Sequence, residues 1–271
     1  MPKKSYIYIF AFLTFIAATI FSTYGYARID ILPRKVVMES RDRSAEITVM
    51  NLFEQPSLMR VSIIHYRQNE DGSYTKLDEP LSDVFDPETI ARFSPRQFIL
   101  SPGGRQKIRL SLRKPADLPQ GEYRFHVLVT RYDVEDDGST KSNEGASIQL
   151  KMNMGVAIPV VVRQGNLDVS AKMENIRIIP ASESSSGKPQ LGLTIFRDGS
   201  AGSIGELQAF WTPKGAKSRK IGEITNMNVF SEIKRRDVVL PLEELPLGAG
   251  QLRLIYTNDD GAVYDEVILD Q

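Results

Sequence analysis

Apolar and polar positions alternate without a break over residues 148–162. Every even-numbered position, from Ile148 to Val162, holds a sizeable apolar side chain, whereas the odd positions are polar, small or proline as far as Val161. Successive side chains of a β-strand point to opposite faces, so the pattern predicts one strand with a continuous hydrophobic face. Ordinary strands have about 5–6 residues. We therefore expect this strand either to serve two sheets in turn or to keep part of its apolar face for a partner.

Shorter stretches with strand character, separated by turn signals, lie on both sides of this segment. No strand pattern alternates with a long helical pattern, which argues against a parallel α/β fold. The chain is therefore predicted to be all-β, with an immunoglobulin-like β-sandwich over 28–164 and a second β-sandwich over 165–271. Trp211 is expected in the second core. The predicted strands are 36–38, 45–51, 59–66, 93–100, 106–112, 122–131, 167–179, 190–196, 204–212, 219–229, 237–242, 251–256 and 263–269.

The first 27 residues have the composition of an export signal. Lys3 and Lys4 precede an uncharged apolar run over 6–21, and Gly25-Tyr26-Ala27 supplies small residues at the positions that a signal peptidase reads. We expect cleavage after Ala27, which in a bacterium would leave the chain in the periplasm with no segment inserted in the membrane. The alternative is an uncleaved anchor, for which the run falls short of the ~20 residues that a membrane span needs.

Composition and charge narrow the classes of function. The 34 basic and 34 acidic residues give zero formal net charge, which offers no electrostatic reason to expect a nucleic acid partner. The absence of cysteine excludes disulfides, thiol nucleophiles and cysteine metal sites. His65 and His126, the two histidines, both lie in predicted strands, and no common catalytic motif is present. We therefore predict a protein that is not an enzyme and needs no cofactor.

Two weaker signals each have an ordinary explanation. Acidic residues from Asp133 to Glu144 approach the spacing of a calcium-binding loop, but the third position is Glu135 and the flanks read as strands. A flexible acidic hairpin would show the same spacing of acidic residues, so we predict no metal site. Arg34 lies beside a predicted strand, where an arginine either is a solvated charge or binds a carboxylate in a bidentate interaction.

Several features together resemble a known family. They are the export signal, Pro33-Arg34, the long alternating strand that ends in Ile158-Pro159-Val160-Val161-Val162-Arg163, and the second sandwich. The segments 93–104 and 118–124 add to the match. The chain resembles the periplasmic pilus chaperones of the PapD-like family, which act in the chaperone–usher pathway. The resemblance is good over 28–163 and only architectural over the second domain.

This resemblance implies two immunoglobulin-like domains joined at an angle and a function in pilus assembly. Such a chaperone caps a pilus or fimbrial subunit by lending its long strand to the groove that the subunit leaves open, and delivers it to an outer-membrane usher. By position, Ile148, Leu150, Met152 and Met154 would be the donor side chains. Arg34 would hold the subunit's C-terminal carboxylate, and the loop 133–145 matches the connection before the donor strand.

One position departs from the family pattern. Pro159 stands where the family usually has a lysine that serves as the second carboxylate anchor, and the nearest charges on this strand are Lys151 and Arg163. Anchoring by Arg34 alone, or with a substitute from another strand, is therefore expected. The alternative function is an exported structural or adhesion component of a pilus, although a subunit would need an N-terminal donor extension, and residues 28–33 are short for one.

Overall fold

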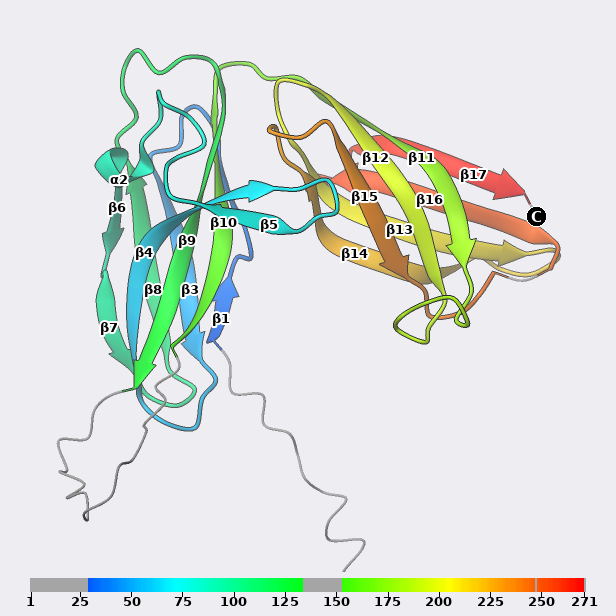
Figure 1. Ribbon diagram of the computed structural model, residues 1–271, viewed down its shortest axis with the longest axis horizontal. Helices are drawn as coiled ribbons and strands as arrows, with labels where there is room; N and C mark the ends of the chain where they lie inside the picture. The colour runs from blue at the N-terminus through cyan, green and yellow to red at the C-terminus, as the bar shows by residue number, and fades with distance from the viewer. Residues whose placement is uncertain (1–28, 134–152, 247, 271) are drawn as a thin grey trace, which may run out of the picture.

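The computed structural model describes residues 29–133, 153–246 and 248–270. They form two lobes set at an angle (Figure 1). The predicted export signal, most of the acidic loop and three of the four predicted donor residues, namely Ile148, Leu150 and Met152, lie outside the described residues. Among the described residues, no helix is both long and apolar enough to cross a membrane.

The first lobe is a β-sandwich with one helical turn. Its elements are β1 (Ile29–Leu32), β2 (Val36–Met38), β3 (Ser44–Asn51), β4 (Ser57–Gln68), β5 (Tyr74–Leu77), α2 (Pro87–Ile90), β6 (Ala91–Ser94), β7 (Gln97–Leu100), β8 (Arg105–Leu112), β9 (Gly121–Asp133) and β10 (Met154–Gln164). One sheet has the strand order β1-β3-β8-β6. The other has the order β2-β10-β9-β4-β5, and β7 also pairs with β4.

The second lobe is a smaller pair of sheets. Its strands are β11 (Val169–Ile179), β12 (Gln190–Gly199), β13 (Ser203–Pro213), β14 (Arg219–Val229), β15 (Arg235–Pro241), β16 (Gly250–Asn258) and β17 (Val263–Asp270). One sheet has the order β11-β12-β15 and the other the order β14-β13-β16-β17. The predicted all-β class is confirmed. The predicted domain limits stay a prediction, although β10 ends at Gln164 and β11 begins at Val169.

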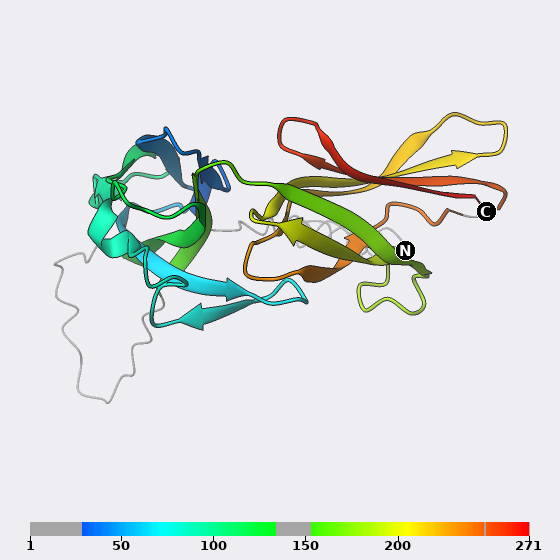
Figure 2. The ribbon, with the colours of Figure 1, turned by 90° about the horizontal axis from the view of Figure 1, so that it is seen from above.

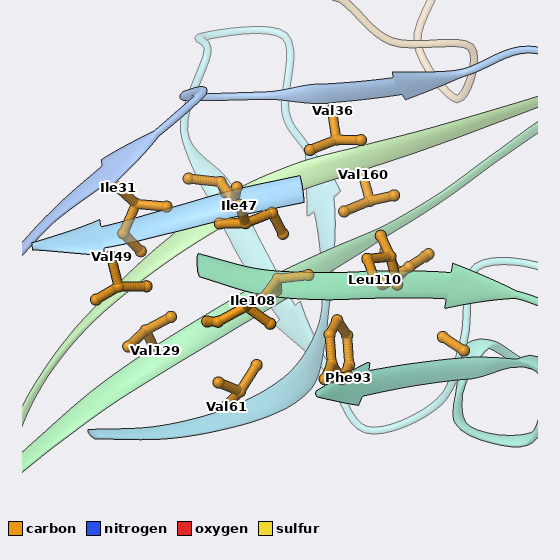
Figure 3. Close-up of a cluster of buried hydrophobic side chains, with 14 of the residues drawn as sticks. Ile31, Val36, Ile47, Val49, Val61, Phe93, Ile108, Leu110, Val129 and Val160 are labelled. Carbon is orange, nitrogen blue, oxygen red and sulfur yellow. The ribbon is translucent and has the colours of Figure 1, made fainter. Parts of the chain in front are cut away.

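Each lobe has its own hydrophobic core, because alternate residues of its strands face inward. In the first core, side chains from both sheets meet, among them Ile47 and Ile108 from one sheet and Val129 and Val160 from the other (Figure 3). Trp211 is 1% exposed in the second core, as predicted. The hydroxyl of Tyr123, near the start of β9, donates to the carbonyl of Pro119 at 2.9 Å, a tyrosine corner of the kind found in immunoglobulin-like sandwiches.

The β4–β5 hairpin extends from the first lobe to the second (Figure 2). Its turn is tight: Gly72 has a φ of +83° and donates its N–H to the Asn69 carbonyl at 2.9 Å. At the tip, the Glu70 carbonyl accepts from the N–H of Asp237 at 2.7 Å. The Glu70 carboxylate accepts from Arg235 Nε, also at 2.7 Å. The turn therefore docks on strand β15 of the second lobe.

A second group of contacts joins the lobes nearer to β10. Arg124 forms a buried ion pair with Glu232, and its guanidinium lies 4.1 Å from the ring centre of Phe230. Arg163 contacts Glu122 at 3.1 Å and donates to the carbonyl of Gly202 at 3.2 Å. Burial opposes the charge of Arg163, but its acidic partners outweigh burial and raise its pKa. The Arg124–Glu232 ion pair and the hydrogen bond from Arg163 to Gly202 therefore hold the start of β9 and the end of β10 against the second lobe.

Candidate functional site: the edge of strand β10

Strand β10 is paired along its whole length on one side and only at one end on the other. It runs antiparallel to β9 from Met154, opposite Arg131, to Gln164, opposite Gly121. On its other side, the parallel strand β2 pairs only with residues 160–162. Within the described ranges, no strand is hydrogen-bonded to residues 154–159 on that side. This segment therefore offers an edge on which another strand can form a ladder.

The apolar face of β10 passes from the core to the surface as it approaches its start. Val160 and Ile158 are buried in the first core, and Val156 packs at its margin. Met154, the one predicted donor residue within the described ranges, is 49% exposed. Its role, like those predicted for Ile148, Leu150 and Met152, stays a prediction. The face that is sealed at one end of the strand is open to solvent at the other.

The opposite face of β10 meets the second lobe at its far end. Val161 is fully buried and packs with Ile204 and Phe230, both buried residues of the second lobe. The long strand was expected either to serve two sheets or to keep part of its apolar face for a partner. Its described part belongs to one sheet only, and it reaches the second lobe through side chains on its other face.

The carboxylate anchor predicted at Arg34 has a basic neighbour that sequence reasoning missed. Arg34 is exposed in the segment between β1 and β2. The side chain of Lys35 is only 15% exposed and forms an ion pair of 2.6 Å with Asp259, in the turn between β16 and β17. Lys35 directly precedes Val36, which pairs with Val160, the residue after Pro159. Continued by one residue, this parallel register places Lys35, in the segment that leads into β2, opposite Pro159.

The other charges near β10 are already occupied or lie elsewhere. Arg163 is engaged by Glu122 and Glu39. Lys151 is outside the described residues. Arg34 and Lys35 are the two basic residues of the β1–β2 segment, and Lys35 is itself paired, with Asp259 of the second lobe.

Both histidines are buried in strands, as predicted, His65 in β4 and His126 in β9. The rings of Tyr66 and Tyr74 meet that of His126 edge-on at 5.1 and 5.7 Å. Burial, and then the positive charge of Arg124, lower the pKa of His126 to about 3. The imidazole is therefore neutral near pH 7 and acts as a packing residue.

Metal-binding side chains do not gather in the described part of the chain, where no group of three or more His, Asp and Glu residues lies close enough to hold an ion. The calcium-like pattern that begins at Asp133 continues outside the described residues. Its interpretation as an acidic loop stays a prediction.

No family model matches the chain, and no curated protein matches it. Solved structures similar to it include the YadV chaperone, with 14% identity over 90% of this chain and 99% of that chain and a TM-score of 0.43. The class 5 fimbriae chaperone CfaA has 14% identity over 90% and 99%, with a TM-score of 0.45. The Salmonella enterica SafA pilin in complex with the SafB chaperone gives 15% identity over 90% and 97%, with a TM-score of 0.41.

Proposed function

We propose that this chain is a periplasmic chaperone that caps pilus or fimbrial subunits by lending them a strand and passes them to an outer-membrane usher. The observation that carries the proposal is the edge of β10 at residues 154–159, beside an apolar face that opens to solvent at Met154. The donated segment includes the stretch from 148, with Ile148, Leu150, Met152 and Met154 as the donor side chains.

The energetics favour this use of the strand. A subunit that lacks one strand exposes an apolar groove and two unpaired strand edges, which are both aggregation hazards. Four buried apolar side chains contribute about 1.5–3 kcal/mol each before the cost of ordering the partners. Ladder hydrogen bonds add about 0.5–1.5 kcal/mol each. The capture therefore needs no nucleotide, metal or catalytic residue.

The subunit's C-terminal carboxylate is held, in this proposal, by Arg34 together with Lys35. Lys35 is presented toward the second lobe by its ion pair with Asp259. An incoming carboxylate would replace Asp259 as its partner, so the lysine would exchange one ion pair for another. This arrangement supplies from the β1–β2 segment the anchor that Pro159 cannot supply from β10.

The alternative, an exported structural or adhesion component, is disfavoured by strand β1. A pilus subunit would need a free N-terminal segment to donate to its neighbour. Residues 29–32 are instead paired with β3, from Ile29 opposite Asn51 to Leu32 opposite Thr48. They are committed to the sheet of this chain.

The test is the double variant Met152→Asp plus Met154→Asp, with Ile99→Asp plus Val263→Asp as the matched control. Ile99 and Val263 are 61% and 57% exposed and lie on other strands. We expect both double variants to fold. In periplasmic extracts the control should recover its subunit by co-purification, and the β10 variant should recover none. Normal recovery with the β10 variant would rule out strand donation by these residues.

A further inference from the structure

A cavity of about 520 Å³ lies in the first lobe where α2, the ends of β6 and β8, and the segment before β3 meet. This volume falls in the range of about 300–1,000 Å³ typical of small-ligand sites. None of its lining residues belongs to β10 or to the second lobe, so it is separate from the proposed strand-donation site. The lining residues are Arg43, Thr89, Ile90, Arg92, Arg109, Ser111, Leu112 and Arg113.

The cavity is strongly basic. Four of its eight lining side chains are arginines, and none is acidic. Within the described part of the chain, none of these arginines forms an ion pair with a carboxylate. Arg92 donates from Nη1 to the carbonyls of Glu88 and Ala91 at 3.1 and 2.8 Å, and Arg109 donates from Nη2 to Ser44 Oγ at 3.4 Å. Most of the guanidinium N–H donors therefore have no acceptor among the described residues.

Backbone hydrogen bonds hold the segments around the cavity together. The N–H of Leu112 donates to the carbonyl of Arg43, and that of Arg113 to the carbonyl of Ile90, both at 2.9 Å. Lys114 Nζ donates to the carbonyls of Glu39 and Ser40 at 2.7 and 3.0 Å, which fastens the segment that carries Arg43. The backbone around the cavity is therefore held in place before a ligand arrives, which lowers the cost of ordering these segments on binding.

One arginine of the cavity acts on a neighbouring lysine. The pKa of Lys114 is lowered first by burial and then by the charge of Arg43, whereas Asp42 and Glu39 act in the opposite direction. Four like charges around one cavity repel one another, so an anion of multiple charge gains more here than it would at a single arginine. Planar guanidinium groups match the oxygens of phosphate in bidentate pairs.

We infer that this cavity binds a phosphate-bearing anion, with Arg43, Arg92, Arg109 and Arg113 as the cationic ligands and the hydroxyls of Thr89 and Ser111 as additional donors. A phosphate monoester or diphosphate has more terminal oxygens than the two of a carboxylate, and so satisfies more of the four arginines. The same chemistry occurs in soluble phosphate compounds and in phosphorylated lipid headgroups. The inference does not depend on the proposed chaperone function.

The test uses calorimetric titration of the purified chain with sodium pyrophosphate at constant ionic strength, with citrate as the carboxylate comparison. The cavity variant is Arg92→Gln plus Arg109→Gln. The matched control is Arg105→Gln plus Lys107→Gln, which removes two charges from the same face of β8 outside the cavity. The substituted residues of the cavity variant are exposed at the surface, so near-ultraviolet circular dichroism should show that it stays folded.

We expect saturable binding of one pyrophosphate, weakened about tenfold or more in the cavity variant and changed less than about twofold in the control. Citrate should bind more weakly. Sedimentation with phosphatidylcholine vesicles, with and without phosphatidic acid, then distinguishes a lipid ligand from a soluble one. Cosedimentation that requires both phosphatidic acid and the cavity arginines indicates a lipid headgroup. Pyrophosphate binding without cosedimentation indicates a soluble ligand. The inference is overturned if neither probe binds, if citrate binds as tightly as pyrophosphate, or if both double variants lose binding equally.

Discussion

The side-chain amides of Gln68 and Asn228 are joined by a hydrogen bond of 2.7 Å that crosses from the first lobe to the second. Gln68 Oε1 also accepts from the backbone N–H of Phe230 at 2.9 Å, and its own backbone N–H donates to Glu232 at 3.0 Å. Gln68 is 1% exposed and Asn228 is 9% exposed. Because these groups are buried, bulk water does not replace a lost partner, and the bonds oppose separation of the lobes.

Gln68→Ala should therefore destabilise the protein and loosen its lobes. The variant leaves the buried N–H of Phe230 without its acceptor and removes one donor to Asn228, whose side-chain oxygen still accepts from Arg236 at 3.2 Å. The unsatisfied N–H is expected to lower the free energy of unfolding by about 1–3 kcal/mol. Urea denaturation measures this loss, and small-angle scattering should show a larger radius of gyration. Gln106→Ala is the control, because its amide bonds at an exposed position to the carbonyl of Lys107. Equal stability of the two variants would contradict the prediction.

The ion pair of Arg124 and Glu232 should behave as a buried pair. The two side chains are 2% and 16% exposed. Glu232→Gln leaves the charge of Arg124 without its counter-charge, and a loss of about 3–5 kcal/mol in the free energy of unfolding is expected. The double variant Arg124→Met plus Glu232→Gln should be less destabilised than the sum of the single variants. A strictly additive double-mutant cycle would show that the pair contributes no coupling.

His126 should make stability depend on pH in the acidic range. An unfolded histidine has a pKa of about 6.5, whereas the folded value is about 3. Below pH 6.5 the unfolded chain takes up a proton that the folded chain does not, so stability is lost as the pH falls from about 6.5 toward 3. Between pH 7 and pH 5 this residue should account for about 2 kcal/mol. Between pH 7 and pH 5, the free energy of unfolding of His126→Asn should fall by correspondingly less than that of the wild type. Equal losses in the two proteins would exclude His126 as the cause.

Lys35→Met and Arg34→Met separate the two candidate anchors for a subunit carboxylate. If Lys35 supplies the proposed anchor in place of Pro159, its removal should weaken subunit binding about tenfold or more, because a charge-assisted hydrogen bond is lost. Surface plasmon resonance with the captured subunit measures the change. Lys107→Met is the control, since Lys107 is a lysine in an exposed ion pair with Glu46 at 2.9 Å. If Arg34→Met loses binding and Lys35→Met does not, Arg34 is the anchor and Lys35 is not.

Gly205→Ala should disrupt the second lobe although it adds only one methyl group. A Cβ at this position would lie 1.7 Å from the carbonyl oxygen of Thr257 on the neighbouring strand β16. Relief of that overlap requires the β13–β16 ladder to separate, so the free energy of unfolding should fall by about 1–3 kcal/mol or more. Gly121→Ala is the control, because its Cβ would meet Tyr123 at 3.7 Å, an ordinary contact. Wild-type stability in Gly205→Ala would refute the expectation.

The strands of the fold could be predicted because alternation and turn residues are local signals. The structure confirms the shorter predicted strands, although 93–100 divides into β6 and β7 around Pro95. The long strand predicted over 148–162 is confirmed from Met154 onward, and residues 148–152 lie outside the described ranges. Strand β5 was missed because its residues, from Tyr74 to Leu77, are mostly exposed and show no alternation of burial. The short strand β1 and the single turn α2 were missed as well. Short elements carry too few residues for a periodic pattern to appear.

The pairings that build the candidate site could not be predicted from one sequence. The place of Lys35 beside Pro159 depends on the parallel register of β2 with β10, which no local pattern specifies. The basic cavity likewise combines Arg43, Arg92, Arg109 and Arg113, which are far apart in the sequence. The exposed apolar face near Met154 was the exception, because it follows directly from the continuous alternation of the chain.

Pro159 has a consequence for any strand that joins β10. A proline has no N–H to donate to a ladder, and the next residue, Val160, is already opposite Val36 of β2. An added strand would therefore meet a stop at this point and could grow only toward the beginning of β10. Pro159 and the pairing with β2 therefore limit the length of an added strand, whatever side chains that strand carries.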